Sequence, residues 1–313
     1  MEPFSYVAYA ENDFSDAGPS LTVLDGELWI GWSGGGNGHP NAMPAVVRPD
    51  GSMYFATDRK LTLWDERAAG GVPMSSAAAP GEAAMAWTID NRAGELNTII
   101  GATFTAQPSE ARELVSFEWS DHTPALCQFS REVYVAWTGS NNLQINCAPL
   151  VYDEEGGGWV FSSGRKSVSA ETSDYEPSLA WRPGPSRLYV AWTGEGDHEL
   201  NVMYAPGPGL LDPPPERADF DRSTKHTFSS ETSDGGPALL VRGGQLVLAY
   251  RGSGNRNLNV LWTDMDDNYS YISKATSGRT TPYQPAIASY QDWLYVAWTG
   301  EDHNLNVGRL IRP

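Results

Sequence analysis

Four short turns in this chain place a carboxylate in the same setting, a Ser-Asp-x-x-Pro sequence just before an apolar run. The four aspartates are Asp16, Asp121, Asp174 and Asp234. Carboxylates accept hydrogen bonds, so a repeated turn of this kind could bind a hydroxyl-rich ligand at several similar places. Ser-Asp before Pro is also common turn chemistry, in which the side chains bond only to nearby backbone. The sequence leaves both interpretations open.

A second repeated phrase separates the turns and indicates how they are positioned. Residues 188–194 read Leu-Tyr-Val-Ala-Trp-Thr-Gly and are followed by Leu-Asn-Val at 200–202. Similar phrases recur around 133–147, 246–260 and 294–307, with weaker ones around 28–41 and 85–97. The aromatic residue of the phrase recurs every 48 to 58 residues, as Trp32, Trp87, Trp137, Trp192, Tyr250 and Trp298. Such a period is typical of a repeat architecture.

Each repeat contains about four short apolar and β-branched runs separated by Gly, Asp and Asn, and no segment has a sustained helical period. This pattern predicts an all-β fold, a six-bladed β-propeller with four-stranded antiparallel blades, formed by residues 1–313 as a single domain. The blades are expected at approximately 16–66, 67–118, 119–170, 171–230, 231–276 and 277–313. The last blade lacks a fourth strand, and residues 1–10 are expected to complete it and so remove exposed sheet edges.

The repeated aromatic residues favour a structural role, because blades pack face to face and large aromatic side chains dominate such packing. The repeated Asn at the start of each third strand is expected to bond local backbone. Cys127 and Cys147 fall on the first and third strands of one blade, which lie too far apart for a disulfide. We therefore expect two buried free thiols, consistent with a reducing compartment.

Net charge excludes some partners. The chain carries a formal charge of −18, which argues against nucleic acid and anionic membranes as partners. It shows no apolar run of transmembrane length and no signal-peptide pattern at its start. The sequence as given is expected to be cytoplasmic, with a non-classical route of secretion and the oligomeric state left open.

In a four-stranded meander, the loop entering the first strand and the loop joining strands two and three emerge on the same face. That face is expected to collect the four turn aspartates and the polar loops that follow Ala-Trp-Thr-Gly. The further residues expected there are His39, His122, Glu195, Asp197, His198, Arg256, Glu301, Asp302 and His303. From this set, the candidate ligand-binding residues are Asp16, Asp121, Asp174, Asp234, His39, His198, Arg256 and His303. Loops on a rigid scaffold commonly carry binding functions.

The chain resembles two groups of propellers, sugar-binding six-bladed lectins and the sialidase-like superfamily. The resemblance covers the whole chain and rests on the Leu-Tyr-Val-Ala-Trp-Thr-Gly repeats joined by Ser-Asp-x-x-Pro turns. Ser233–Gly236 is similar to the start of a sialidase Asp-box but lacks its Ser-x-Asp-x-Gly-x-x-Trp spacing. The arginine triad and the Tyr/Glu pair of a sialidase cannot be assigned, so the resemblance implies no catalytic residues here.

Three functions are compatible with these features. The leading hypothesis is a multivalent, lectin-like glycan-binding protein with repeated sites on the loop face, because near-equivalent loops imply several similar sites. The alternative is a propeller enzyme of glycoside hydrolase, lyase or cyclase type. Its single acid/base site would lie at the channel mouth and use His122, Asp121, Glu195 and His198. Differences between the blades favour this enzyme, and a protein-interaction platform is the third possibility.

The sequence carries no signature of a resident cofactor. It contains no phosphate-binding loop, no nucleophile elbow and no Cys or His pair at zinc spacing. The acidic segment 264–268 could bind calcium, although it lacks the spacing of a calcium loop. The ligand is therefore expected to be a glycan or another small molecule, with no cofactor and calcium left as an option.

Overall fold

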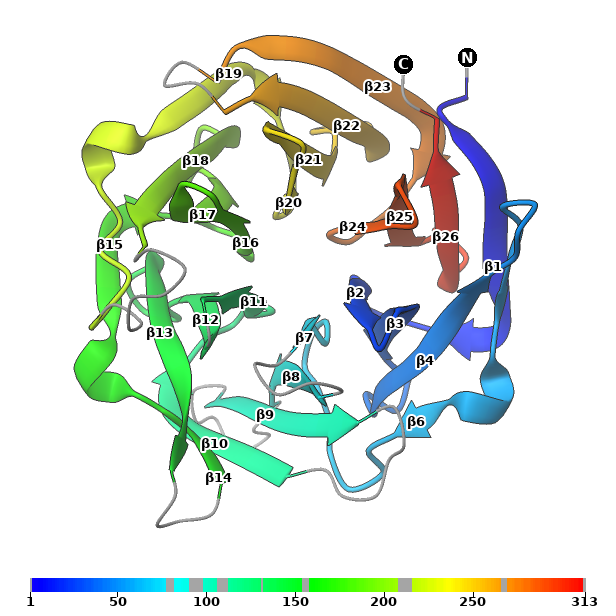
Figure 1. Ribbon diagram of the computed structural model, residues 1–313, viewed down its shortest axis with the longest axis horizontal. Coiled ribbons are helices and arrows are strands. Elements are labelled where there is room, and N and C mark those ends of the chain that lie inside the picture. The colour runs from blue at the N-terminus through cyan, green and yellow to red at the C-terminus, as the bar shows by residue number, and fades with distance from the viewer. Residues whose placement is uncertain are drawn as a thin grey trace.

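The protein is built almost entirely of antiparallel β-sheets arranged around a central axis (Figure 1). A computed structural model describes residues 2–76, 82–89, 98–105, 112–130, 132–153, 158–207, 216–265 and 269–311. In these residues the strands form six sheets, each running outward from a short inner strand. The only helices described are single 3₁₀ turns, η1 (Thr57–Arg59), η2 (Ser163–Arg165) and η3 (Arg222–Thr224). The predicted all-β propeller with antiparallel blades is confirmed.

The sheets follow the order of the chain. The first contains β2 (Ser20–Leu24), β3 (Glu27–Ser33), β4 (Pro40–Val47), β5 (Met53–Phe55) and β6 (Leu61–Thr62). The second contains β7 (Met74–Ser76), β8 (Glu82–Thr88), β9 (Thr98–Thr105) and β10 (Arg112–Trp119). The third contains β11 (Ala125–Phe129), β12 (Glu132–Thr138), β13 (Gln144–Asp153), β14 (Gly158–Phe161) and β15 (Ser167–Thr172).

The remaining three sheets have four strands each. The fourth contains β16 (Ser178–Pro183), β17 (Ser186–Thr193), β18 (Glu199–Pro206) and β19 (His226–Thr232). The fifth contains β20 (Ala238–Arg242), β21 (Gln245–Arg251), β22 (Asn257–Asp264) and β23 (Tyr271–Thr280). The sixth contains β24 (Ala286–Tyr290), β25 (Trp293–Thr299), β26 (Asn304–Leu310) and β1 (Phe4–Phe14).

Two sheets differ from the predicted four strands. In the first sheet β5 and β6 both pair with β4, and in the third β14 and β15 both pair with β13. The cause is a 3₁₀ turn, η1 or η2, which divides the outermost strand into two short segments. The core of each of these blades is unaffected, because the inner three strands keep the common arrangement.

The N-terminal strand completes the last sheet, as the sequence predicts. β1 pairs antiparallel with β26, with Phe4 opposite Leu310 and Ala8 opposite Val307. The strand continues to Phe14, beyond the expected end at residue 10. Figure 1 shows the two chain ends side by side, so the pairing joins the start of the chain to its end.

The repeated aromatic residues lie in the core between neighbouring sheets. Trp192 of β17 is 1% exposed and packs in one cluster with Phe129 and Tyr134 of the preceding sheet. Tyr250 of β21 shares a second cluster with Tyr189 of β17. The predicted packing role of these residues is confirmed, and the apolar contacts between sheets provide the main stabilisation of the ring.

At the rim, charged pairs link one blade to the next at several boundaries. Lys225, from the outer part of the fourth sheet, contacts Glu171 on β15 of the third sheet and lies over the Trp192 ring. The same arrangement recurs as Lys60–Asp13 over Trp32, Lys166–Glu118 over Trp137, and Lys274–Glu231 over Tyr250. A cation over an aromatic face is favourable, and more so when the cation is partly desolvated.

The fifth and sixth sheets reverse the charges of this pair. Arg279 on β23 stands where the other outer strands carry an acid, two residues before the hydroxyl residue of the turn. Glu2 takes the place of the lysine and lies 3.7 Å from the Arg279 Nε. The Arg279 guanidinium lies 5.6 Å from the centre of the Trp298 ring. At this boundary the acid and the base have exchanged places, but a pair of opposite charges is still present.

The two cysteines are free, as predicted. Cys147 is buried and Cys127 is half-buried, and they lie on β13 and β11 with β12 between them. Burial raises the pKa of Cys127 to about 12 and also raises the pKa of Cys147. Both thiols therefore stay protonated at neutral pH, which makes them poor nucleophiles.

Replacing Glu171 with Ala should lower the free energy of unfolding by about 3 kcal/mol, because Lys225 loses its partner in a largely buried pair. The Glu171 side chain is only 8% exposed. Asp219→Ala is the matched control, since its partner Arg217 is 58% exposed and the loss should stay below about 1 kcal/mol. Chemical denaturation of both variants measures the difference, and equal losses would contradict a stabilising role for the rim pairs.

Candidate functional site

Each Ser-Asp turn is closed by its own hydroxyl. The Ser173 Oγ donates to the Tyr175 carbonyl at 3.0 Å and accepts from the Tyr175 N–H at 3.1 Å. Ser15, Ser120 and Ser233 make the same two bonds, and Thr281 does so in the turn before β24. The serine of the motif is therefore a turn-forming residue, and the turn recurs before five of the six sheets.

The threonine of Ala-Trp-Thr-Gly fixes the next turn in place. The Thr193 Oγ1, on β17, donates to the Gly235 carbonyl of the following blade at 2.7 Å. Thr88, Thr138 and Thr299 make the corresponding bond to the turn of the next blade. Arg251 replaces the threonine on β21, and its guanidinium donates to the Pro282 and Asp234 carbonyls. Neighbouring turns are thereby held in register around the axis.

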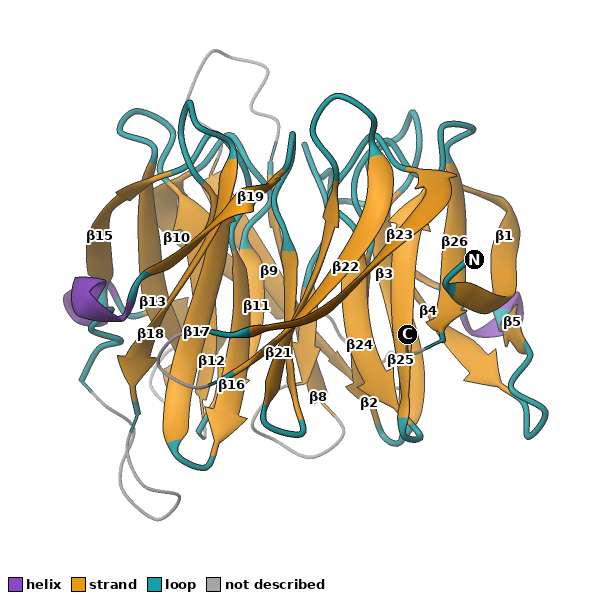
Figure 2. Ribbon diagram, turned by 90° about the horizontal axis from the view of Figure 1, so that it is seen from above, coloured by secondary structure: helices purple, strands orange, loops and turns teal. Residues whose placement is uncertain are grey.

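Three of the four predicted aspartates tie two loops of one blade together. The Asp16 carboxylate accepts from the Gly36 N–H at 2.7 Å, and the Asp234 carboxylate accepts from the Gly254 N–H at 2.7 Å. Asp174 and the Gly196 N–H make the same contact at 3.2 Å. These bonds show that the Ser-Asp turns and the loops after Ala-Trp-Thr-Gly lie on one face, as the topology predicts. We call this the loop face; Figure 2 shows the strands running between it and the opposite face.

Two of these aspartates, Asp16 and Asp234, face a histidine from the preceding blade. The His303 Nδ1, in the loop between β25 and β26, lies 2.9 Å from the Asp16 Oδ1. The His198 Nδ1 lies 3.4 Å from the Asp234 Oδ1 and 3.2 Å from the Ser233 carbonyl. The next boundary carries Arg256, whose Nη1 lies 3.4 Å from the Glu301 Oε2. Three successive blade boundaries therefore present a nitrogen-bearing side chain beside a carboxylate.

The nitrogen-bearing side chains at these boundaries share one backbone conformation. His198, Arg256 and His303 all have a left-handed backbone, with φ of 58°, 55° and 64°. Gly38 has this conformation in the first blade, with φ of 68°. His39 follows it and lies elsewhere, with its Nδ1 2.9 Å from the Glu66 carbonyl and its ring edge against Trp64. His39 is thus one position out of step with His198 and His303.

Hydrogen bonding lowers the pKa of Asp234. The main cause is the Ser253 hydroxyl, which donates to the Asp234 Oδ1 at 2.7 Å, followed by the Gly254 N–H. A carboxyl group with a lowered pKa stabilises the folded loop above its ordinary pKa. That contribution is lost only as the pH falls through the lower, folded value. The Asp234 carboxylate is therefore held ionised at any physiological pH.

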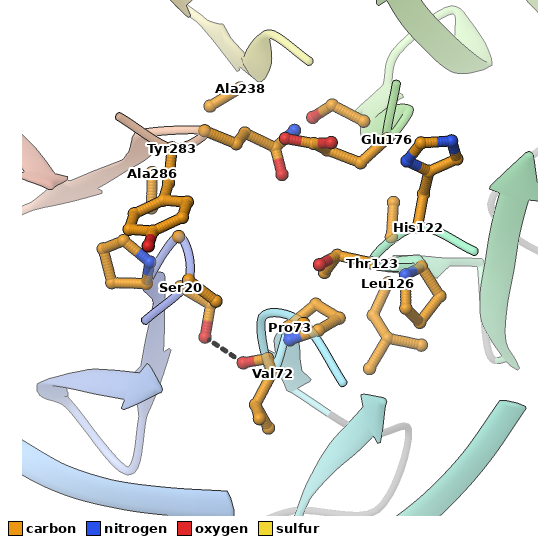
Figure 3. A pocket seen from close by; sticks show the side chains of 18 of the residues that line it. Ser20, Val72, Pro73, His122, Thr123, Leu126, Glu176, Ala238, Tyr283 and Ala286 are labelled. Atoms are coloured by element: carbon orange, nitrogen blue, oxygen red, sulfur yellow. Dashed lines mark hydrogen bonds between the residues drawn. The ribbon is translucent and has the colours of Figure 1, made fainter. Parts of the chain in front are cut away.

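A funnel opens at the centre of the loop face, with a volume of about 300 Å³. The turns before the first strands line it, and all six sheets contribute residues. In its wall the Ser20 hydroxyl donates to the Val72 carbonyl at 2.6 Å, which joins the first two blades (Figure 3). Asp121 and His122 belong to this lining, whereas Glu195 and His198 do not. The structure therefore separates the four residues expected of a single acid/base site.

Glu176 is the funnel residue that sequence reasoning missed. Its side chain and that of His122 come from neighbouring turns and lie on the same side of the opening in Figure 3. Within the described residues, neither side chain has a hydrogen bond or ion pair. Tyr283 lies across the opening, and burial, then the charges of Asp16 and Glu301, raise its pKa. The funnel thus combines a carboxylate, an imidazole and a neutral phenol.

The position of Glu176 in its motif could have identified it. It is the residue directly before Pro, and the equivalent residues Gly18, Thr123 and Gln284 also line the funnel. At Gly18 an added Cβ would lie 2.4 Å from the Gln284 carbonyl oxygen. At Gly236 it would lie 2.1 Å from the Glu176 carbonyl oxygen. Glycine at these two turns lets neighbouring turns approach closely, so side chains from the other turns define the funnel.

The described residues contain no group of three or more His, Cys, Asp or Glu residues able to hold a metal ion. Part of the candidate calcium segment, residues 266–268, lies outside the described residues, as does the repeated Asn97 of the second blade. No helix in the described part of the chain is long and apolar enough to cross a membrane.

The chain matches no known family model and no curated protein. Solved structures share its fold. A GH43_1 enzyme from Xanthomonas citri, complexed with xylose, is 13% identical with a TM-score of 0.51, covering 97% of this chain and 90% of the enzyme. A mutant Aleuria aurantia lectin, in complex with Fucalpha1-6GlcNAc, is 13% identical with a TM-score of 0.53 over 84% of this chain and 79% of the lectin.

A third structure of similar fold is named for an activity that does not involve carbohydrate. Kuenenia stuttgartiensis hydrazine synthase is 13% identical with a TM-score of 0.53, over 97% of this chain and 99% of that protein. At this level of identity the likeness establishes the β-propeller fold alone. The function must therefore be argued from the chemistry of the loop face.

Replacing Asp234 with Ala should free the loop at 252–256, because the Ser253 hydroxyl and the Gly254 N–H lose their acceptor. Hydrogen exchange of that loop should accelerate about tenfold, as expected for loss of a hydrogen bond to a charged group. Asp234→Asn keeps an acceptor oxygen and is the matched control, and Glu195→Ala tests an exposed acid of the corresponding loop. Unchanged exchange in Asp234→Ala would show that the carboxylate does not hold the loop.

Proposed function

We propose that the protein is a six-bladed, lectin-like carbohydrate-binding protein with several sites around its loop face. The observation that carries this proposal is the recurrence of an exposed nitrogen–carboxylate pair at three successive blade boundaries. The pairs are His198–Asp234, Arg256–Glu301 and His303–Asp16. Each sheet counts as one blade in this description.

Such pairs suit sugar hydroxyl groups. A hydroxyl donates one hydrogen bond and accepts others, so adjacent donors and acceptors can bind the two sides of a diol. The paired side chains remain open to a ligand, with 49% of His303 and 55% of Asp16 exposed. The bonds to Gly36 and Gly254 already orient two of the carboxylates, which lowers the entropy lost on binding.

Several weak sites on one rigid ring can give strong binding to a multivalent surface. Linking sites in this way increases avidity by about 10²–10⁴ without any new contact. The lectin among the structures of similar fold binds a fucosylated sugar, and the GH43_1 enzyme holds xylose. These neighbours support carbohydrate as the ligand class. We propose no resident cofactor, and calcium near residue 264 stays an option that a chelator can test.

Titration of the intact chain with glycans selected on an array should give more than one site per chain. Asp16→Ala should remove one site, at the boundary between the sixth and first blades, and leave the others unchanged, since each boundary has its own pair. Asp234→Ala should likewise remove only a fraction of the binding capacity, because His198 and Asp234 form one of the three pairs. Isothermal titration calorimetry with and without a chelator measures the stoichiometry and any metal dependence.

Asp58→Ala, which removes an exposed acid from η1, serves as the control and should leave binding unchanged. One substitution that abolished all binding would contradict the multivalent arrangement. No binding to any glycan would contradict the proposal as a whole.

A single-site enzyme remains the second candidate, because the Glu176 and His122 side chains have no partner among the described residues. Glycoside hydrolysis normally requires two carboxyl groups beside the bond that breaks. Of the acids lining the funnel, Asp16 is bonded to Gly36 and faces His303, and Asp121 also has a partner. This leaves Glu176 as the one unpartnered carboxylate among the described lining residues, which favours binding over hydrolysis.

The two candidates separate in an assay of aryl glycosides and polysaccharides. For a lectin, we expect no turnover by the wild-type protein and no effect of Glu176→Gln on binding at the blade boundaries. Turnover that falls at least 100-fold in Glu176→Gln, with Glu195→Gln unaffected as the control, would identify the funnel as an active site.

A further inference from the structure

A second cavity lies on the face opposite the loop face, between the fifth and sixth sheets. Its volume is about 410 Å³, within the range of about 300–1,000 Å³ typical of small-molecule sites. Residues of the turns joining β20 to β21 and β24 to β25 line it. We propose that this cavity is a further carbohydrate-binding site, distinct from those of the loop face.

The interior of the cavity is apolar. Trp262 of β22 and Leu310 of β26 are each 2% exposed and line it together with Val247 and Leu294. These side chains belong to the core between the two sheets. Because these side chains are already almost fully buried, the apolar surface that a ligand could cover is mainly that of the exposed rim residue Trp293.

One aromatic side chain at the rim is held for stacking. Trp293 begins β25, is 46% exposed and lines the cavity. The Arg309 guanidinium lies 4.2 Å from its ring centre and 4.4 Å from that of Tyr6. This contact fixes the orientation of an exposed indole, which would otherwise lose rotamer freedom on binding. An oriented indole suits the C–H face of a sugar ring.

The polar groups of the cavity also lie at its rim, on two facing turns. Arg242 at the end of β20 donates to the Asp292 carbonyl of the neighbouring sheet and so joins the turns. Arg242, Gln245 and Asp292 supply a guanidinium, an amide and a carboxylate to the lining. Both donors and acceptors are present, which matches a ligand that has several hydroxyl groups. A purely aromatic ligand would leave the carboxylate desolvated without a partner, at a cost.

The turn that carries Asp292 is strained. Gln291 and Asp292 have left-handed backbone conformations, with φ of 47° and 64°. The corresponding turn of the fifth sheet uses Gly243 and Gly244 for this conformation. Side chains in this conformation are less favourable than glycine, although aspartate tolerates it better than most residues. The sixth sheet thus brings a carboxylate to the cavity from a turn in which the fifth sheet has only glycine.

The site would give one chain carbohydrate-binding groups on opposite faces. A single molecule could then link a carbohydrate-bearing surface bound at its loop face to a second such surface bound at the opposite face. The assignment does not depend on the loop-face sites, because no residue is shared between the second cavity and the pairs at the blade boundaries.

The test uses the full chain and the methyl glycosides of glucose, galactose, mannose, fucose, xylose and N-acetylglucosamine, with affinities measured by ligand-observed NMR. At least one glycoside should bind, and Trp293→Ala should weaken it at least about tenfold through loss of the stacking surface. Trp293→Phe should retain most of the affinity. Asp292→Asn, which tolerates the left-handed backbone, should also weaken binding.

Trp119→Ala is the control, because it removes an indole of similar exposure, 49%, from β10. Unchanged affinity in both Trp293→Ala and Asp292→Asn, with folding verified by thermal melting, would overturn the assignment. So would the absence of binding to every glycoside. Loss of binding in Trp293→Ala, with binding of the same glycoside unaffected in Asp16→Ala, Asp234→Ala and Glu301→Ala, would support this site while contradicting those at the loop face.

Discussion

The contact on which the loop face depends is the hydrogen bond between one blade and the turn of the next. The threonine of Ala-Trp-Thr-Gly donates to the carbonyl that the turn serine also binds, as Thr193 does at Gly235. The same carbonyl thus closes its own turn and binds the preceding blade. Because the donor is buried, its loss would leave a buried hydroxyl or carbonyl without a full set of partners. These bonds hold four of the turns that line the funnel.

Opposite charges reinforce the same boundaries at the rim. The Arg279–Glu2 pair, with its reversed order, shows that the boundary requires complementary charge and an aromatic partner, not particular residues. Similarly, Arg251 keeps two carbonyl contacts where threonine is missing. Repeats can therefore diverge at single positions while the ring keeps its geometry. This tolerance allows the loops to differ without loss of the scaffold that positions them.

The sequence predicts the scaffold better than the site. The repeated Trp and Asn residues and the unpaired N-terminal strand are sufficient to predict the propeller and the pairing of β1 with β26. The repeated Asp is also visible, but its bonds to Gly36, Gly196 and Gly254 require the loop conformations. Glu176 was missed because the position before Pro varies among Gly, Thr, Glu and Gln, and such variation carries no motif. His39 is predicted on the same face as His198 because both lie in loops that follow a second strand, but its backbone position in the loop differs by one.

Some features of the molecule recur from blade to blade, whereas others occur only once. The turn hydroxyls and the rim charges recur because neighbouring blades pack against each other in a similar way. The funnel is different, since turns from all six sheets line one opening. Glu176 and His122 each occur there only once. Repeated chemistry at the boundaries and unique chemistry at the centre are both consequences of the ring. A ligand bound at the boundaries would meet similar groups several times, whereas a ligand in the funnel would meet Glu176, His122 and Tyr283 only once. If the protein binds carbohydrate as proposed, the boundaries would contribute avidity and the centre selectivity.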